Sequence, residues 1–213
     1  MILKVTPTRI TLLNLKREVN VAERGYKLLK DKRDGLMKQF MAVIREAQSL
    51  RTSVENRLGD AFGAYTKASS LMHPKTIRSA FLLPGVKTTL DVKVKSVMSV
   101  PVPQFEIHAE GNPITYGMLE TPGQLDGAIQ KFSDVLVDMV RLAELEKKAE
   151  SLAAEIERTR RRVSALENVR IPNLKETIRF ITLRLEEQAR DAVVSTMRVK
   201  AMIEKKEAAL RSA

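Results

Sequence analysis

The sequence predicts a mainly α-helical protein, in which two long helices form an antiparallel coiled coil and a small β-hairpin element lies between them in the chain. The first observation is the placement of proline: six of the eight prolines fall between residues 74 and 122, and only Pro7 and Pro172 lie outside. Because proline removes a backbone donor and breaks helices, the middle is irregular or β and the flanks are free to be helical. We expect an N-terminal coiled-coil helix in 1–72, a β-hairpin-containing segment in 73–122 and a C-terminal coiled-coil helix in 123–213.

The second observation is an apolar repeat in the first flank, whose steps alternate between three and four residues. Twelve of its thirteen positions are apolar, and Arg33 is the exception. The repeat runs through Leu12, Leu15, Val19, Ala22, Tyr26, Leu29, Arg33, Leu36, Phe40, Val43, Ala47, Leu50 and Val54. Such spacing keeps one seam facing a partner helix and predicts a left-handed supercoil. After Val54 we expect the stripe to shift by one residue, to Leu58, Phe62, Tyr65 and Met72.

The second flank carries a matching repeat, in which only Glu146 and Thr159 are not apolar. It runs through Ala128, Phe132, Val135, Met139, Leu142, Glu146, Ala149, Leu152, Ile156, Thr159, Val163 and Leu166. Pro172 is expected to kink or restart this helix, because its ring clashes with the preceding turn. The stripe resumes at Ile178 and Ile181 but weakens toward Ser195, beyond which we expect the helix to fray.

The length of the two flanks explains why they are predicted to pair. Helices over about 8–72 and 124–210 would span roughly 95 and 130 Å at 1.5 Å per residue. A single helix gains most of its stability from packing its apolar face, so neither flank is expected to be stable alone. The simplest arrangement is one helical hairpin with the two seams facing each other.

The third observation is a change of period in the middle segment. Apolar and charged residues alternate strictly in Leu90-Asp91-Val92-Lys93-Val94-Lys95, which predicts a strand with one face buried. The run Val100-Pro101-Val102-Pro103 favours an edge or an interruption over a central strand. We therefore place a small β-hairpin within 84–119.

Composition excludes several kinds of chemistry. Cysteine is absent, so there can be no disulfide, thiolate metal site or cysteine nucleophile. The first residues lack the apolar core of a signal peptide, and no apolar stretch is long enough to span a membrane. We expect a cytoplasmic chain without direct membrane insertion. The formal net charge of +11 favours an anionic partner: nucleic acid, a membrane surface or an acidic protein.

No catalytic, cofactor or metal site can be assigned from the sequence. His73 and His108 lack the neighbouring ligands of a metal site, and each is expected to have a surface or turn role. The stretch from Gly59 to Gly63 lacks the Lys-Ser/Thr ending of a phosphate-binding loop. We therefore expect a chain that is not an enzyme.

Two basic features are candidate partner interfaces. Arg33 occupies a seam position, where a charge can fix the register or meet a carboxylate of the facing helix. Arg160, Arg161 and Arg162 point to different sides of a helix, since successive residues are about 100° apart. This spread suits contact with several surrounding surfaces, although a purely solubilising role is the simpler alternative. Nucleic-acid binding is not favoured, because neither interleaved aromatic residues nor a known module accompanies the basic residues.

Several motifs resemble the D subunit of V-type and archaeal-type (A/V) ATPases, in the right order and across essentially the whole chain. They are Pro7-Thr8-Arg9, the run from Lys27 to Asp34, Met98-Ser99-Val100 with Pro103, and the run from Thr159 to Glu167 with Ile171-Pro172. Ser164 departs from the pattern, since the family usually has Asn there.

The resemblance implies a role for the chain and a set of partners. The two helices would form the rotor axle of the central stalk, inside a hexamer of catalytic and non-catalytic subunits. The small F subunit would bind the side of the axle, and the funnel-shaped C (or d) subunit would link it to the membrane ring. The complex would be peripheral to the membrane and would couple ATP hydrolysis or synthesis to ion transport. The alternative from another class is a coiled-coil scaffold or tether unrelated to ATPases.

Overall fold

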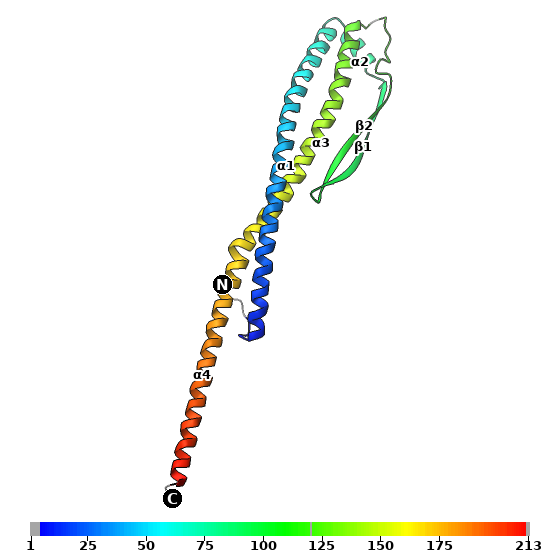
Figure 1. The fold of residues 1–213 in the computed structure, drawn as a ribbon. Helices are drawn as coiled ribbons and strands as arrows, with labels where there is room; N and C mark the ends of the chain where they lie inside the picture. The colour runs from blue at the N-terminus through cyan, green and yellow to red at the C-terminus, as the bar shows by residue number, and fades with distance from the viewer. Residues whose placement is uncertain (1–4, 120, 212–213) are drawn as a thin grey trace. The chain divides into compact units, whose positions relative to one another are not determined.

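The computed structural model describes residues 5–119 and 121–211, with side chains up to residue 205, and it confirms the mainly helical fold (Figure 1). The helices are α1 (Arg9–Ser70), the short α2 (Pro74–Ala80), α3 (Gly123–Ala165) and α4 (Ile171–Arg211), and a π-helical turn η1 (Leu166–Arg170) joins the last two. The strands β1 (Val86–Val97) and β2 (Val100–Gly111) form an antiparallel hairpin. Helix α2 was not expected from the sequence. Its N-terminus is capped by His73, whose Nδ1 accepts a hydrogen bond from the Lys75 N–H at 3.3 Å.

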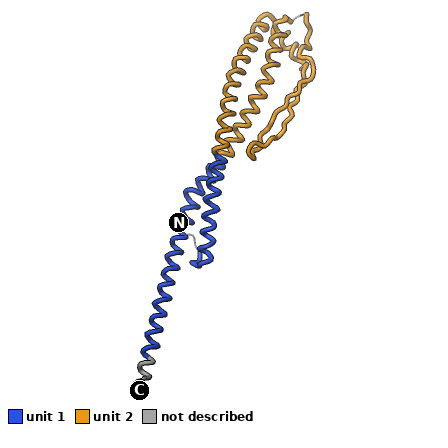
Figure 2. Tube along the Cα trace, in the orientation of Figure 1, with its two compact units in different colours: residues 1–33, 158–213 blue, residues 34–157 orange. Residues whose placement is uncertain are grey.

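The chain divides into two compact units, each of which takes a stretch of α1 and a stretch of the returning helices (Figure 2). Unit 1 comprises Met1–Arg33 and Arg158–Ala213, and unit 2 comprises Asp34–Glu157. The units are a different grouping from the three consecutive segments, which remain a prediction about domain organisation.

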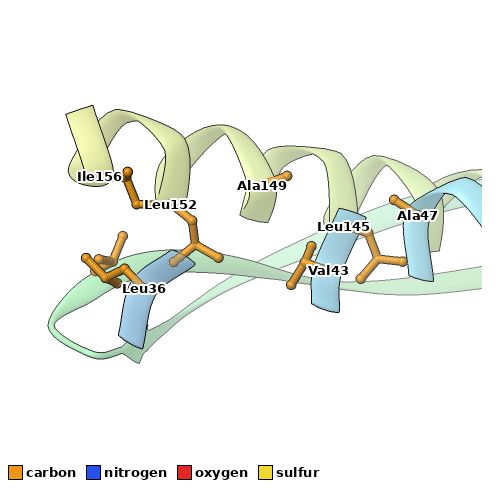
Figure 3. Close-up of a cluster of buried hydrophobic side chains, with 8 residues drawn as sticks. Leu36, Val43, Ala47, Leu145, Ala149, Leu152 and Ile156 are labelled. Atoms are coloured by element: carbon orange, nitrogen blue, oxygen red, sulfur yellow. The ribbon is translucent and has the colours of Figure 1, made fainter. Parts of the chain in front are cut away.

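In unit 2 the predicted seam is the core. Side chains of α1 and α3 point toward one another along it, and Leu36 and Leu152 are fully buried (Figure 3). The buried cluster consists of Leu36, Val43, Ala47, Val100, Leu145, Ala149, Leu152 and Ile156. Ion pairs cross this seam from Arg51 to Glu146 at 2.7 Å and from Arg57 to Asp138 at 2.5 Å. As the α1 number rises the α3 number falls, so the helices are antiparallel.

All thirteen predicted seam positions of α1 are buried or half-buried, but three other expectations were wrong. After Val54 the expectation fails at Phe62, which is 54% exposed beside the fully buried Ala61, whereas Leu58, Tyr65 and Met72 are half-buried as expected. On α3, Leu145 rather than Glu146 occupies the seam, which leaves Glu146 outside to meet Arg51. Met139 is likewise exposed, because the seam runs from Phe132 to Val135 and then to Asp138, two successive steps of three residues.

The hairpin turn explains where the prolines of β2 are tolerated. Met98 and Ser99 both have positive φ, 51° and 68°, which is the geometry of a two-residue type I′ turn. The closing pair Val97 and Val100 is then hydrogen-bonded, and the pairs that follow alternate, so that the next pair, Ser96 and Pro101, is not hydrogen-bonded. Pro101 and Pro103 fall in the non-bonded pairs, so their missing N–H groups would have pointed away from β1. Strand β2 therefore continues through the prolines without an interruption.

The tip of this hairpin packs on α1. A side chain at Gly35 would bring its Cβ within 2.8 Å of the Met98 Cε, so the missing side chain makes room for Met98. Val100 belongs to the core cluster with Leu36, and the Phe105 N–H donates to Glu144 of α3 at 3.0 Å. The tip of the middle segment therefore contributes Val100 to the core of the seam. The expectation that β1 buries one face is also wrong, because Leu90, Val92 and Val94 are 47%, 57% and 72% exposed.

In unit 1 the start of α1 packs against η1 and α4. The buried cluster there is Leu15, Val19, Leu174 and Ile181. Pro172 has no N–H to give to the carbonyl of Asn168, which accounts for the π-helical turn that precedes it. The apolar packing ends near Leu185, as the sequence predicted. The helix nevertheless continues to Arg211, so the expected fraying beyond Ser195 is not observed.

We predict that truncation in the seam costs far more than truncation beside it. Leu36 is fully buried and Leu28, on the same helix, is 69% exposed. Leu36→Ala should lower the free energy of unfolding by about 2–5 kcal/mol, because it removes buried methyl groups and leaves a cavity. Leu28→Ala should change it by no more than about 0.5 kcal/mol. Denaturant unfolding of the two variants checks this, and equal losses would contradict the seam as the source of stability.

A second prediction concerns a hydrogen bond near α2. The Tyr116 hydroxyl donates to Asp126 of α3, and burial together with this carboxylate raises the pKa of Tyr116. Since the pKa is higher in the folded state, the contribution of Tyr116 is fully present below pH ~10 and is lost as pH rises above it. Tyr116→Phe should cost about 1 kcal/mol at pH 8. The gap between the two proteins in unfolding free energy should narrow above pH 10; a gap that stays constant to pH 11 would show that the ionisation is not linked to folding.

Candidate partner interfaces

The net positive charge of the chain lies entirely in unit 1. Unit 1 contains 23 Lys and Arg against 10 Asp and Glu, whereas unit 2 contains 14 against 16. Ion pairs within unit 1, such as Glu18 with Arg170 and Glu23 with Lys175, leave the excess unchanged, because each pair takes one charge of either sign. Along the sequence the excess is spread over both helical flanks, and the pairing of α1 with α4 brings it together in unit 1. Unit 1 is therefore the surface that an acidic partner would recognise.

The structure places the four predicted interface arginines in unit 1. Arg160, Arg161 and Arg162 are all exposed on α3, flanked by the buried Thr159 and Val163. Within the described residues, Arg160 and Arg162 have no ion-pair partner. Arg33 is half-buried in the seam and is not an unpaired charge. Arg160 and Arg162 are thus available to a partner, whereas Arg161 and Arg33 each already have an interaction within the chain.

The part of α4 beyond Leu185 has no partner helix in the described structure. Every residue from Glu186 to Lys205 is exposed. The exposed apolar side chains include Val193, Val194, Met197, Val199, Met202 and Ile203. From Glu186 to Arg211 the helix is roughly 39 Å long at 1.5 Å per residue. Helices in proteins gain most of their stability from packing, and the described residues supply none to this stretch.

Unit 2 has an aromatic hollow close to α2. It is lined by Phe62, Tyr65, Phe81, Ala128, Ile129 and Phe132. Phe62 and Phe132 meet edge to face, with ring centroids 5.2 Å apart, and Phe62 and Phe81 are half-exposed. Leu71, Leu82 and Leu83 are exposed nearby in the sequence. The sequence reasoning missed this surface because it assigned Phe62 to the seam and did not predict α2.

The described residues offer no obvious site for chemistry. Residues 5–119 and 121–211 contain no group of three or more acidic or histidine side chains that could hold a metal ion. His108 lies on β2, with its Nε2 3.6 Å from Asp91, and both side chains are exposed. In the same ranges no helix is both long and apolar enough to cross a membrane. The features that stand out are surfaces for contact with other proteins.

Comparison with known proteins identifies the family. The family model for the D subunit of ATP synthase matches residues 11–201. The chain belongs to the ATP synthase D-subunit family. It is 45% identical over 207 residues to the V-type ATP synthase D subunit of Clostridioides difficile, covering 96% of this chain and 93% of that protein. It is 43% and 42% identical to proteins of the same name from Fusobacterium nucleatum and Clostridium botulinum, covering 95% and 96% of this chain and 98% and 97% of theirs.

Membership of the D-subunit family confirms the resemblance that the sequence motifs indicated. Its one noted departure has a structural consequence, since the Ser164 Oγ accepts a hydrogen bond from the Asn168 Nδ2 at 3.0 Å. This bond links the last turn of α3 to η1. The smaller Ser therefore keeps a polar contact at the position where the helix changes its hydrogen-bond pattern.

Proposed function

We propose that this member of the D-subunit family is the non-catalytic central-stalk rotor of a V/A-type rotary ATPase. It transmits torque between the ATP-hydrolysing or ATP-synthesising hexamer and the ring that translocates ions across the membrane. The observation that carries the proposal is α4 beyond Leu185, an exposed helix with apolar side chains in the unit that holds the net charge. A helix of this kind requires a surrounding partner, which a ring of subunits supplies.

Torque needs a shaft whose helices do not slide past one another. In unit 2 the interdigitated seam resists sliding, because moving one helix by a turn would expose Leu36 and Leu152. Arg51–Glu146 and Arg57–Asp138 flank the seam and add about 0.2–1 kcal/mol each, since each pair has at least one side chain that is more than half exposed. Most of the stiffness therefore comes from packing spread along the helices.

The charge distribution supports an assignment of the partners. Unit 1, with its positive excess and exposed α4, contacts the inner surface of the hexamer, whose lining is acidic where it meets Arg160–Arg162. The aromatic hollow of unit 2 suits the funnel-shaped C or d subunit, because it is apolar and uncharged along Phe62, Phe81 and Phe132. The small F subunit binds elsewhere on the side of the helices. The assembly is peripheral to the membrane on the cytoplasmic side.

We predict that the arginine triplet serves assembly rather than folding. Replacement of Arg160, Arg161 and Arg162 by Gln should leave the melting temperature of the free chain within about 2 °C of wild type, because exposed substitutions cost little. The same variant should assemble with the hexamer more weakly, and the loss should be smaller at high salt, where wild-type binding is itself screened.

The matched control removes three exposed cations from unit 2, by changing Lys38, Arg45 and Lys131 to Gln. This control should assemble as wild type does. Native mass spectrometry at several salt concentrations measures both variants. If the arginine variant unfolds the free chain, or if the control weakens assembly equally, the assignment of the triplet to the hexamer is wrong.

We also predict that the isolated chain does not bind ATP. The chain has no Gly-Lys-Ser/Thr sequence, which ends the Gly-rich loop that holds phosphates, so calorimetric titration with Mg-ATP should show no saturable heat. Saturable binding with a Kd below about 1 mM would contradict a non-catalytic shaft.

A further inference from the structure

The β-hairpin exposes a face that its sequence pattern would bury. Residues opposite each other in an antiparallel pair point to the same face, so one face collects the even-numbered residues of β1 and the odd-numbered residues of β2. We call it the uncharged face, because none of its twelve residues carries a charge. Its members are Val86, Thr88, Leu90, Val92, Val94 and Ser96 on β1 and Pro101, Pro103, Phe105, Ile107, Ala109 and Gly111 on β2. Leu90, Val92 and Val94 remain about half or more exposed on it.

The two edges of the hairpin differ in their capacity to pair. On β2, the three outward N–H positions nearest the turn are unavailable, because Pro101 and Pro103 have no N–H and the Phe105 N–H donates to Glu144; an outward N–H remains only from Ile107 onward. Prolines and side-chain caps are devices that block an edge strand from further pairing. On β1, the corresponding outward groups belong to Thr88, Leu90, Val92 and Val94, and each retains its N–H. The described residues place no strand along that edge.

The charges on the opposite face indicate the chemistry of a strand that would pair with β1. Lys93 is hydrogen-bonded to Glu106 at 2.5 Å, and this contact raises the pKa of Lys93 and lowers that of Glu106. Lys87 and Lys95 have no ion-pair partner among the described residues. Two copies of β1 would bring six lysines against two aspartates, which disfavours self-pairing. A strand with carboxylates at these positions satisfies both lysines.

We propose that β1 is the docking edge for an extended strand of another protein of the ATPase complex, whose side chains alternate between apolar and acidic. Its apolar side chains extend the uncharged face over Leu90, Val92 and Val94. Its acidic side chains lie beside Lys87 and Lys95, on the other face. The identity of the partner as a protein of the ATPase complex rests on the proposed function, whereas the free edge of β1 does not depend on it.

The first test uses the alternation of the amides along β1. Hydrogen exchange is measured at single residues in the free full-length chain and in the purified assembly. In the free chain the amides of Leu90, Val92 and Val94 should exchange freely, whereas those of Asp91, Lys93 and Lys95 are protected by β2. In the assembly the first set should slow by at least about tenfold while the second changes little. Equal slowing of both sets, or of neither, would overturn the proposal.

The second test blocks the edge without touching the ladder. Val94 is the cross-strand neighbour of Pro103, at a position where the hairpin already accepts a proline. Val94→Pro removes the outward N–H and should abolish the slowing at Leu90 and Val92 in the assembly. Val94→Ala removes the side chain but keeps the N–H and should preserve the slowing. Exchange at Asp91 and Lys93 in the free chains verifies that both hairpins are intact; identical behaviour of the two variants in the assembly would contradict strand pairing.

The third measurement identifies the partner. A photo-crosslinking amino acid at Val92 in the assembly should join the chain to one other protein of the complex. The crosslinked peptide of that protein should alternate between apolar and acidic side chains. A crosslink only to a second copy of this chain, or to none, counts against the proposal. Co-purification with the catalytic subunits is verified first. If the chain joins the complex but the β1 amides are not protected, only this inference is wrong. If the chain never joins the complex, the proposed function is contradicted as well.

Discussion

Burial of one narrow apolar seam between antiparallel helices is the interaction on which the rest of the structure depends. Neither α1 nor the returning helices carry a second apolar face wide enough to make a separate core. The chain contains few aromatic residues, 4% of the total, so close packing must come from Leu, Val, Ile and Ala repeated along the helices. Other features of unit 2, including the hairpin tip at Gly35 and the ion pairs beside the seam, are positioned by this packing.

Outside the seam, two surfaces expose apolar side chains that partner proteins could cover. Beyond Leu185 the apolar residues of α4 face solvent, and the hairpin exposes an uncharged face that its alternating sequence would bury. At β1 the sequence pattern predicts a buried face that the chain does not cover, and α4 continues as a helix beyond the end of its apolar packing. In one component of a larger complex these surfaces are the natural positions of the other components. The distribution of charge distinguishes the two units as binding surfaces, since only unit 1 has the positive excess that attracts an acidic partner.

The sequence predicted the two long helices and the hairpin because each has a clear period and clear proline boundaries. It misplaced Phe62 and Glu146 because apolar size and a fixed step were followed, whereas the small Ala61 permits closer approach of the helices and Leu145 was the better seam residue. The short α2 has no period of its own, and it depends on the His73 cap and on contacts with Tyr65 and Leu125 that are distant in sequence. Pro172 predicted an interruption of the helix, but only the structure shows that the interruption is a π-helical turn.

Among interface residues, the arginine triplet was accessible to sequence reasoning because three adjacent charges on a helix are visible without a fold. The aromatic hollow and the free edge of β1 were not, since both depend on which residues α1, α3 and the turn at Met98 bring together. Arg33 was found by its position in the repeat. Its half-buried side chain favours a role within the helix pair over direct contact with a partner.

The central claim is that the paired helices turn as one body, and a covalent link between them tests it most directly. The chain has no cysteine, so Arg51→Cys and Glu146→Cys together introduce the only two thiols, at side chains that already meet at 2.7 Å. A flexible bismaleimide then joins α1 to α3 in the assembled complex. The account predicts that the linked complex hydrolyses ATP and couples it to ion transport at the rate of the unlinked one. Loss of turnover on linking, restored when a cleavable linker is cut, would show that the helices must slide and would contradict it.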